Sequence, residues 1–157
     1  MSEHRAQVRW QHAGGPFLKR QYSRAHTWAF DGGAVVRASA SPAGVPLPYA
    51  DPAGVDPEEA FVAAVSSCHM LTFLFEAARA GFEVRSYEDD AVGRMTPNAR
   101  GALWVSHVEL APRVAYGDGA RPTPEEEAEL HRRAHEGCYV ANSVRTAITV
   151  RGLAGAA

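Results

Sequence analysis

The sequence predicts a single α+β domain, and three observations carry that prediction. Strand-like segments come first, a long apolar helix follows, and further strands, a second helix and a last strand complete the 157 residues. Each predicted helix opens with a capping signal, which fixes its start in the sequence. Because there is neither an internal repeat nor a linker-like stretch, we assign residues 1–157 to one domain.

The first forty residues are predicted to form β-strands. Residues 7–11 and 26–30 have the alternation and aromatic content of strands, and residues 17–22 form a plausible strand between them. An Asp-Gly-Gly turn signal follows, and residues 34–40 read as the next strand. Residues 41–55 carry four prolines without any period. A loop of that length in a compact domain is usually functional or part of an interface.

Asp56 is expected to begin the first helix as its N-cap, with a proline at N1 and Glu59 at N3. The helix should run to about Ala80 and end at Gly81. Its apolar residues cover most of the circumference, so it must be buried on all sides, by sheets or by a second copy of the protein. The apolar-rich run, residues 60–75, contains polar residues and is too short for a membrane span, so we interpret it as a core helix.

The second half of the chain is predicted to hold three strands and one helix. Residues 82–93, 102–114 and 143–151 are the expected strands. Thr123 caps the second helix, with a proline at N1 and a glutamate at N3, and the helix should end at Gly137.

Composition excludes several classes of partner. The chain is 46% hydrophobic and 22% charged, which is ordinary for a soluble globular protein. The formal net charge is -2, so the chain lacks the excess of positive charge that is typical of proteins that bind nucleic acid or an anionic membrane. The first residues are polar, without the apolar stretch of a signal peptide, so we expect a cytoplasmic protein.

The chain has two cysteines, and both lie in segments that suit redox chemistry. Cys68 lies inside the apolar helix, and Cys138 follows the end of the second helix. Folding can bring a helical thiol and a turn thiol together, so that the first reacts and the second closes a disulfide. In a reducing cytosol such a pair is more often catalytic, sensing or metal-binding than a standing disulfide.

A thiolate in an apolar helix needs a cation brought to it. Cys68 is too far into its helix for the dipole to help, and the candidate cations are Arg20, Arg24 and Arg37. A buried guanidinium needs a carboxylate, and Glu58 is available at the helix start. Glu58 lies roughly 15 Å along the helix axis from Cys68 and on another face. If both serve one site, we expect Glu58 to come from the partner subunit of a homodimer.

Two motifs resemble a known family. Residues 56–68 read Asp-Pro-Glu-Glu-Ala-Phe-Val-Ala-Ala-Val-Ser-Ser-Cys, and residues 135–144 read His-Glu-Gly-Cys-Tyr-Val-Ala-Asn-Ser-Val. Both are similar to the OsmC / organic hydroperoxide resistance (Ohr) superfamily, and the resemblance covers the whole chain in element order. It implies an α+β, OsmC-like fold in which antiparallel sheets wrap around central helices of an intertwined homodimer.

The resemblance also implies an activity and a site. Cys68 matches the cysteine that attacks the peroxide, Cys138 the resolving cysteine, and Glu58 the family glutamate. Arg24 is our choice for the family arginine, ahead of Arg20 and Arg37. The implied function is a thiol-dependent peroxidase that reduces organic or hydrogen peroxide at sites shared between two subunits. It would use an external dithiol, of lipoyl type in this family, and no cofactor.

Other functions remain open from the sequence. Both cysteines are also compatible with inert core thiols or with a non-catalytic redox sensor or small-ligand-binding protein. Tyr139 stands after the second cysteine, where the family commonly has proline, which suggests a divergent branch. A metal site is a further class: His131, His135 and Cys138 have ligand-like spacing, with Cys68 or His69 as a fourth ligand. Helical histidines on a polar face are, however, usually solvated.

Overall fold

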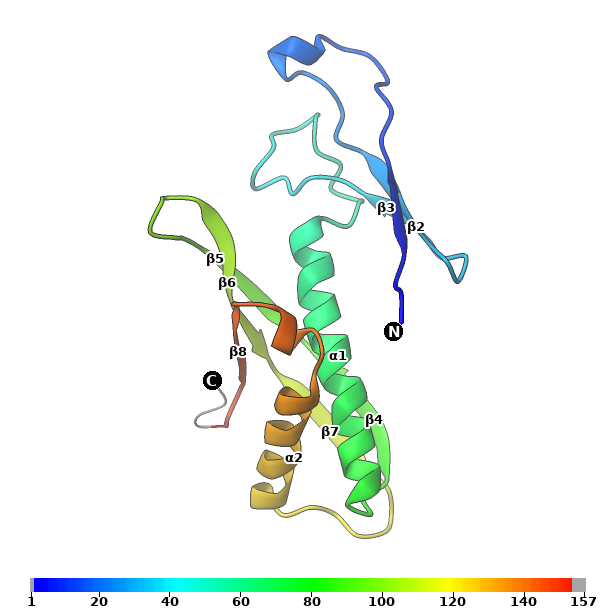
Figure 1. The fold of residues 1–157 in the computed structure, drawn as a ribbon, viewed down its shortest axis with the longest axis vertical. Helices are drawn as coiled ribbons and strands as arrows, with labels where there is room; N and C mark the ends of the chain where they lie inside the picture. The colour runs from blue at the N-terminus through cyan, green and yellow to red at the C-terminus, as the bar shows by residue number, and fades with distance from the viewer. Residues whose placement is uncertain (1, 154–157) are drawn as a thin grey trace. The chain divides into compact units, whose positions relative to one another are not determined.

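The computed structural model describes residues 2–153, which form two compact units. The first unit spans residues 2–60 and the second residues 61–153. The first holds one three-stranded sheet, and the second holds a two-stranded and a three-stranded sheet with two long helices (Figure 1). Strands and helices are thus mixed along the chain, which confirms the predicted α+β class.

The sheet of the first unit is an antiparallel meander. It consists of β1 (Ala6–Arg9), β2 (His26–Phe30) and β3 (Val35–Ala38), in that order. The predicted hairpin turn joins the last two strands, since the Phe30 N–H donates to the Ala34 carbonyl at 2.9 Å. Gly33 has a φ of 88°, the left-handed conformation that glycine adopts most easily.

The strand predicted at residues 17–22 is wrong. Phe17–Lys19 form a short 3-10 helix, η1, whose turn ends at Arg20 with a left-handed φ of 61°. This reversal lets the Phe17 ring stack on Tyr22, with 4.4 Å between the ring centroids. An extended strand would separate these two rings, so aromatic packing overrides the strand propensity of the segment.

Helix α1 (Pro57–Arg79) begins and ends where the sequence predicts. The Asp56 N–H donates to Glu59 Oε2 at 3.0 Å, and the Glu59 N–H donates to Asp56 Oδ1 at 2.8 Å, which completes the capping box. At the other end Gly81 has a φ of 85°, and the Phe82 N–H donates back to the Ala77 carbonyl.

Burial of α1 on all sides is not achieved within one chain. Val65, His69 and Phe73 are buried, but Leu71 and Phe75 are each 61% exposed. The apolar circumference of α1 therefore extends beyond what its own chain covers. By length and composition α1 could also cross a membrane, a test that the core helix of a soluble protein passes equally.

Five strands form the sheets of the second unit. They are β4 (Val84–Asp89), β5 (Val92–Pro97), β6 (Leu103–Leu110), β7 (Pro112–Tyr116) and β8 (Ala147–Val150). Strand β4 pairs with β7, and the other sheet has the order β5-β6-β8, with β8 parallel to β6. Each of the two long predicted strands is thus split in two. One break follows Asp89, between β4 and β5, and the other is at Ala111, between β6 and β7. Asp89 Oδ1 accepts the Ala111 N–H at 2.6 Å, so a hydrogen bond connects the two breaks.

Helix α2 (Pro124–Gly137) lies beside α1 (Figure 1), and a capping box at Thr123 starts it as predicted. One side of the core packs Val65 of α1 against the β6 and β8 side chains Val108, Leu110, Ile148 and Val150. A second cluster joins the two helices through Phe73, Ala77, Leu130 and Ala134. These clusters fix α1 and α2 as neighbours.

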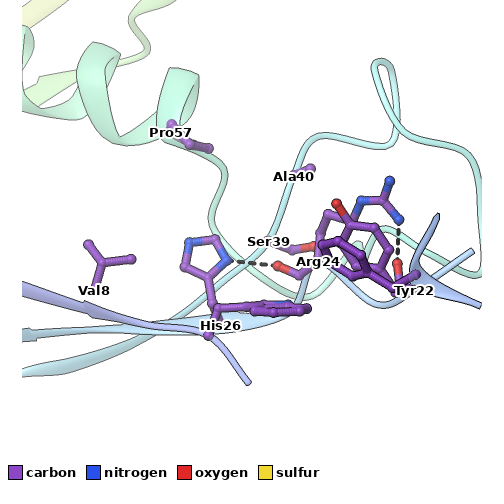
Figure 2. A pocket seen from close by; sticks show the side chains of 9 residues that line it. Val8, Tyr22, Arg24, His26, Ser39, Ala40 and Pro57 are labelled. Carbon is purple, nitrogen blue, oxygen red and sulfur yellow. Dashed lines mark hydrogen bonds between the residues drawn. The ribbon is translucent and has the colours of Figure 1, made fainter. Parts of the chain in front are cut away.

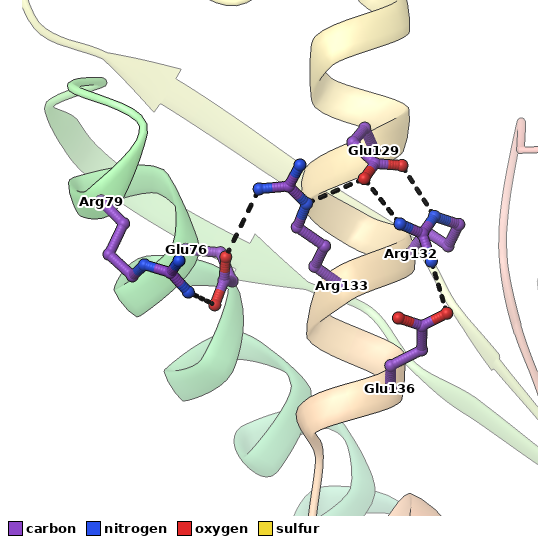
Figure 3. Close-up of polar contacts among 6 residues, drawn as sticks. All are labelled: Glu76, Arg79, Glu129, Arg132, Arg133 and Glu136. Carbon is purple, nitrogen blue, oxygen red and sulfur yellow. Dashed lines mark hydrogen bonds and ion pairs between the residues drawn. The ribbon is translucent and has the colours of Figure 1, made fainter.

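Ion pairs add a link between the two helices (Figure 3). Arg133 of α2 lies 3.9 Å from Glu76 of α1, which also pairs with Arg79 at 2.9 Å. Glu76 is buried but both arginines are exposed, so solvent screens these pairs and their contribution to stability is small. They do, however, connect α2 to α1 about one turn before the C-terminal end of α2.

Candidate active site

The fold of the second unit brings Cys68 and Cys138 together. Cys68 lies midway along α1 and Cys138 is the C-cap residue of α2, and the turn that follows Cys138 contacts both sulfur atoms, so the two thiols are neighbours. Both are free thiols, Cys68 half-buried and Cys138 only 1% exposed. Two thiols in such contact can form a disulfide after a small adjustment of side-chain rotamers.

Backbone N–H groups after Cys138 point at both sulfur atoms. The Val140 N–H donates to Cys68 Sγ at 3.5 Å, and the Ala141 N–H donates to Cys138 Sγ at 3.3 Å. Asn142 fixes this turn, because its side-chain amide donates to the carbonyls of Glu136 and Cys138 at 2.8 and 2.9 Å. N–H donors favour the charged form of a sulfur atom, so the turn is suited to hold negative charge there.

The surroundings of Cys138 favour its protonated thiol. Burial raises the pKa of its thiol, and the hydrogen bond with Cys68 raises it further. Cys138 therefore stays protonated at neutral pH while Cys68 is reduced. The second effect depends on the state of Cys68 and changes when Cys68 is oxidised.

A buried histidine pair lies next to the cysteines. His69 Nε2 and His131 Nδ1 are 3.0 Å apart, and the two residues are only 1% and 3% exposed. The rings stack with 5.3 Å between centroids, and His131 also stacks on Phe73. Burial lowers the pKa of His69 to about 3 and that of His131 to about 4, so both are neutral at pH 7.

The solvated position expected for His131 is wrong, because the packing of α2 on α1 buries it. The signal was present in the sequence: His131, Ala134 and Cys138 recur at helical spacing and share the face that meets α1. Across residues 2–153 no three His, Cys, Asp or Glu side chains are grouped closely enough to hold a metal ion.

Arg24 lies in the first unit, at a cavity of about 420 Å³ (Figure 2). Its guanidinium lies 3.8 Å from the centroid of the Tyr22 ring and donates to the carbonyls of Arg20 and Tyr22. His26 Nδ1 contacts the Arg24 carbonyl at 2.7 Å. The remaining walls are mainly apolar: Val8, Trp10, Phe17, Ser39, Ala40 and Pro57.

Arg24 differs from the other two candidate arginines. Arg37 pairs with Asp51, with its Nε 2.6 Å from Oδ2, whereas Arg24 has no carboxylate partner among residues 2–153. Arg20 is absent from the cavity wall and provides only its carbonyl to Arg24. Glu58 is half-buried in the first turn of α1, and within the described chain no ion pair joins it to Arg24.

The sequence and the structure of this chain are similar to those of several known proteins. The family described as OsmC-like protein matches residues 50–151. An OsmC-like protein of unknown function from Vibrio cholerae is 49% identical, with a TM-score of 0.93 over 96% of this chain and 99% of that chain. An organic hydroperoxide resistance protein of Bacillus subtilis is 20% identical, with a TM-score of 0.63 over 95% of both chains. An OsmC-like protein from Mycoplasma pneumoniae is 13% identical, with a TM-score of 0.71 over 96% and 95%. A search of the curated proteins finds no match.

Proposed function

The chain belongs to the OsmC/Ohr superfamily, and on that premise we propose that it is a thiol-dependent peroxidase. Cys68 is the attacking cysteine and Cys138 the resolving cysteine. The observation that carries this proposal is the contact between the two thiols, which are far apart in sequence and meet where α2 ends against α1. The likeness to the organic hydroperoxide resistance protein of Bacillus subtilis supports the choice of a peroxide substrate.

The proposed reaction runs in three balanced steps. The Cys68 thiolate attacks the terminal peroxide oxygen and the O–O bond breaks, so that Cys68 becomes a sulfenic acid. The leaving alkoxide takes up the proton that the Cys68 thiol released on ionisation and departs as an alcohol. The Cys138 sulfur then attacks Cys68 Sγ, which forms a disulfide and releases water. An external dithiol reduces the disulfide and is itself oxidised to a disulfide. The family resemblance favours a lipoyl-type dithiol for this last step.

The environments of the two sulfurs support this order of events. Cys138 is buried and protonated, so it does not compete with Cys68 for the peroxide. Oxidation of Cys68 removes the thiol-thiol hydrogen bond that helps to keep Cys138 protonated. Cys138 thus becomes more reactive when a sulfenic acid is present to be resolved.

Arg24 and Glu58 are the remaining residues of the proposed site. The largely apolar cavity at Arg24 supports an organic hydroperoxide rather than hydrogen peroxide, because its walls exclude water from an alkyl or aryl group. In this proposal Arg24 stabilises the Cys68 thiolate, and Glu58 orients the guanidinium.

We further propose a homodimer in the cytoplasm, with active sites shared between its subunits. The exposed apolar face of α1, with Leu71 and Phe75, supports a second copy as its cover. Light scattering should give twice the 16.9 kDa chain mass, and a monomeric mass would remove the shared site.

Steady-state turnover of cumene hydroperoxide with dihydrolipoamide tests the function. We expect Cys68→Ser to abolish turnover and Cys138→Ser to stop it after one turnover, with a sulfenic acid on Cys68 that dimedone traps. A non-catalytic redox sensor would oxidise Cys68 once but show no sustained turnover with any dithiol. An inert pair of core thiols would leave both variants and the wild type equally unreactive.

A further inference from the structure

A second cavity, of about 340 Å³, lies in the second unit at the turn between β5 and β6. Its walls are Asn98, Ala99, Arg100, Trp104 and Arg145, none of which belongs to the proposed peroxidase site. The first four come from the β5–β6 hairpin, and Arg145 comes from the segment just before β8. Because β8 pairs with β6, two segments distant in sequence form one wall.

The cavity is lined by positive charge without a counter-charge. Most arginines of residues 2–153 pair with carboxylates, but Arg100 and Arg145 do not. No acidic side chain lines the cavity either. Two guanidinium groups at one hollow focus a positive potential there, although the chain as a whole has a net charge of -2.

The backbone around Arg100 is held in place. Asn98 Oδ1 accepts the N–H groups of Arg100 and Ala102 at 2.9 and 3.1 Å, and the Asn98 N–H donates to the Ala102 carbonyl. On the opposite side, Thr146 Oγ1 donates to the Val105 carbonyl at 2.7 Å and ties the residue after Arg145 to β6. Both arginines therefore project from ordered backbone, which lowers the entropy cost of binding.

An aromatic wall accompanies the two arginines. Trp104 is half-buried in β6 opposite Thr96, and its indole lines the cavity. Guanidinium forks match the geometry of phosphate oxygens, and an indole face stacks on planar rings. Asn98 still has its side-chain amide N–H groups available for the edge of such a ring.

We propose that this cavity binds a small organic anion in which a phosphate group is joined to a planar aromatic ring, of which a mononucleotide is the simplest example. Arg100 and Arg145 bind the phosphate, and Trp104 stacks on the ring. The volume lies within the range of single-ligand cavities, so one small molecule fills it. The net negative charge of the chain disfavours a nucleic-acid strand as the occupant.

Isothermal titration calorimetry with three probes tests the proposal on the wild-type protein. Adenosine monophosphate carries both the phosphate and the ring, whereas adenosine and inorganic phosphate each carry one half. We expect adenosine monophosphate to bind at least about tenfold more tightly than either half, because both contacts contribute. Equal affinity for inorganic phosphate would overturn the ring contact, and no heat with adenosine monophosphate at millimolar concentration would overturn the proposal as a whole.

Substitutions then locate the site. Arg100→Gln and Arg145→Gln should each weaken adenosine monophosphate binding about tenfold, the scale of one charge-assisted contact. Arg121→Gln is the matched control, since Arg121 is also exposed and without a carboxylate partner in the described chain but lies outside this cavity. A loss as large in the control as in the other two would show non-specific attraction and contradict the proposal. Peroxide turnover should be unchanged in all three variants, so this test does not depend on the peroxidase proposal.

Discussion

Gly137 lies so close to Thr72 that a side chain at position 137 would force one of the two residues to move: a Cβ there would be 2.9 Å from Thr72 Cγ2. Gly137 is the last residue of α2 and precedes Cys138, while Thr72 lies one turn after Cys68 on α1. The absent side chain is therefore what lets the end of α2 approach α1 closely enough for the two thiols to meet.

Gly137→Ala should slow disulfide formation between Cys68 and Cys138. The added methyl group pushes Cys138 away from Cys68. A displacement of up to about 1 Å between reacting atoms lowers a rate roughly 10- to 100-fold. Stopped-flow mixing with cumene hydroperoxide, followed by thiol counting at timed intervals, measures the effect. Alanine favours a helix over glycine, so a slower reaction would not come from loss of α2.

Thr72→Ser provides the matched rescue of that variant. Serine keeps the hydroxyl that donates to the Cys68 carbonyl at 3.0 Å but removes Cγ2, the atom that the new methyl would meet. The double variant should recover most of the wild-type rate, and Thr72→Ser alone should change it little. A double variant as slow as Gly137→Ala would mean that this contact does not set the thiol distance.

The histidine pair predicts how stability depends on pH. His69 and His131 have pKa values of about 3 and about 4 in the folded chain, below the ordinary 6.5, so the unfolded chain binds protons more readily. Their neutral form is retained above pH 6.5, and stability is lost as pH falls below that value. Between pH 7.5 and 5.5 protonation of each histidine in the unfolded chain should lower the unfolding free energy by roughly 1 kcal/mol.

Urea denaturation at the two pH values measures this loss. The wild type should lose roughly 2–3 kcal/mol of unfolding free energy from the pair, and His69→Gln should lose about half as much. His4→Gln is the control, because His4 is exposed and should leave the pH dependence as in the wild type. A wild-type unfolding free energy that is flat over this interval would contradict the burial of two neutral histidines.

Arg24→Gln should lower the turnover of cumene hydroperoxide about 100-fold, the scale of one lost charge-stabilising donor. The cavity walls stay intact, so binding of the organic group should change less than the maximal rate. Arg37→Gln is the comparison, since Arg37 already pairs with Asp51 at the surface and should retain nearly full turnover. Equal loss in both variants would remove Arg24 from the site.

Substitutions of two neighbouring carboxylates at the start of α1 should have different effects, one on stability and the other on turnover. Asp56→Ala removes the capping acceptor and should lower the unfolding free energy by about 1 kcal/mol, with turnover of the folded protein retained. Glu58→Gln should leave stability unchanged and lower turnover about tenfold, because Arg24 loses its orienting charge. Full turnover in Glu58→Gln would exclude Glu58 from the reaction.

Local signals explain what could be predicted from the sequence. The capping boxes at Asp56 and Thr123 depend on residues three positions apart, so both helices were predicted closely. The strand breaks at Asp89 and Ala111 involve a hydrogen bond between segments distant in sequence, so local sequence patterns did not predict them. η1 depends on the stacking of Phe17 on Tyr22, which propensity alone does not encode.

The candidate site divides in the same way. The thiols of Cys68 and Cys138 could be predicted to meet because the chain has no other cysteines and both flank recognisable helices. The burial of His131 and its contact with His69 could not be, because they follow from the rotation of α2 on α1. That rotation is set by packing around Phe73 and Ala134, which only the folded chain displays.

The proposed function requires that Cys68 and Cys138 react with peroxide as a pair. Counting the thiols of freshly reduced protein tests this requirement directly. One equivalent of cumene hydroperoxide is added, and the intact mass is recorded before and after. We predict loss of both thiols within seconds and a mass lower by about 2 Da, the signature of one intramolecular disulfide. Two thiols that remain free after minutes would contradict the peroxidase.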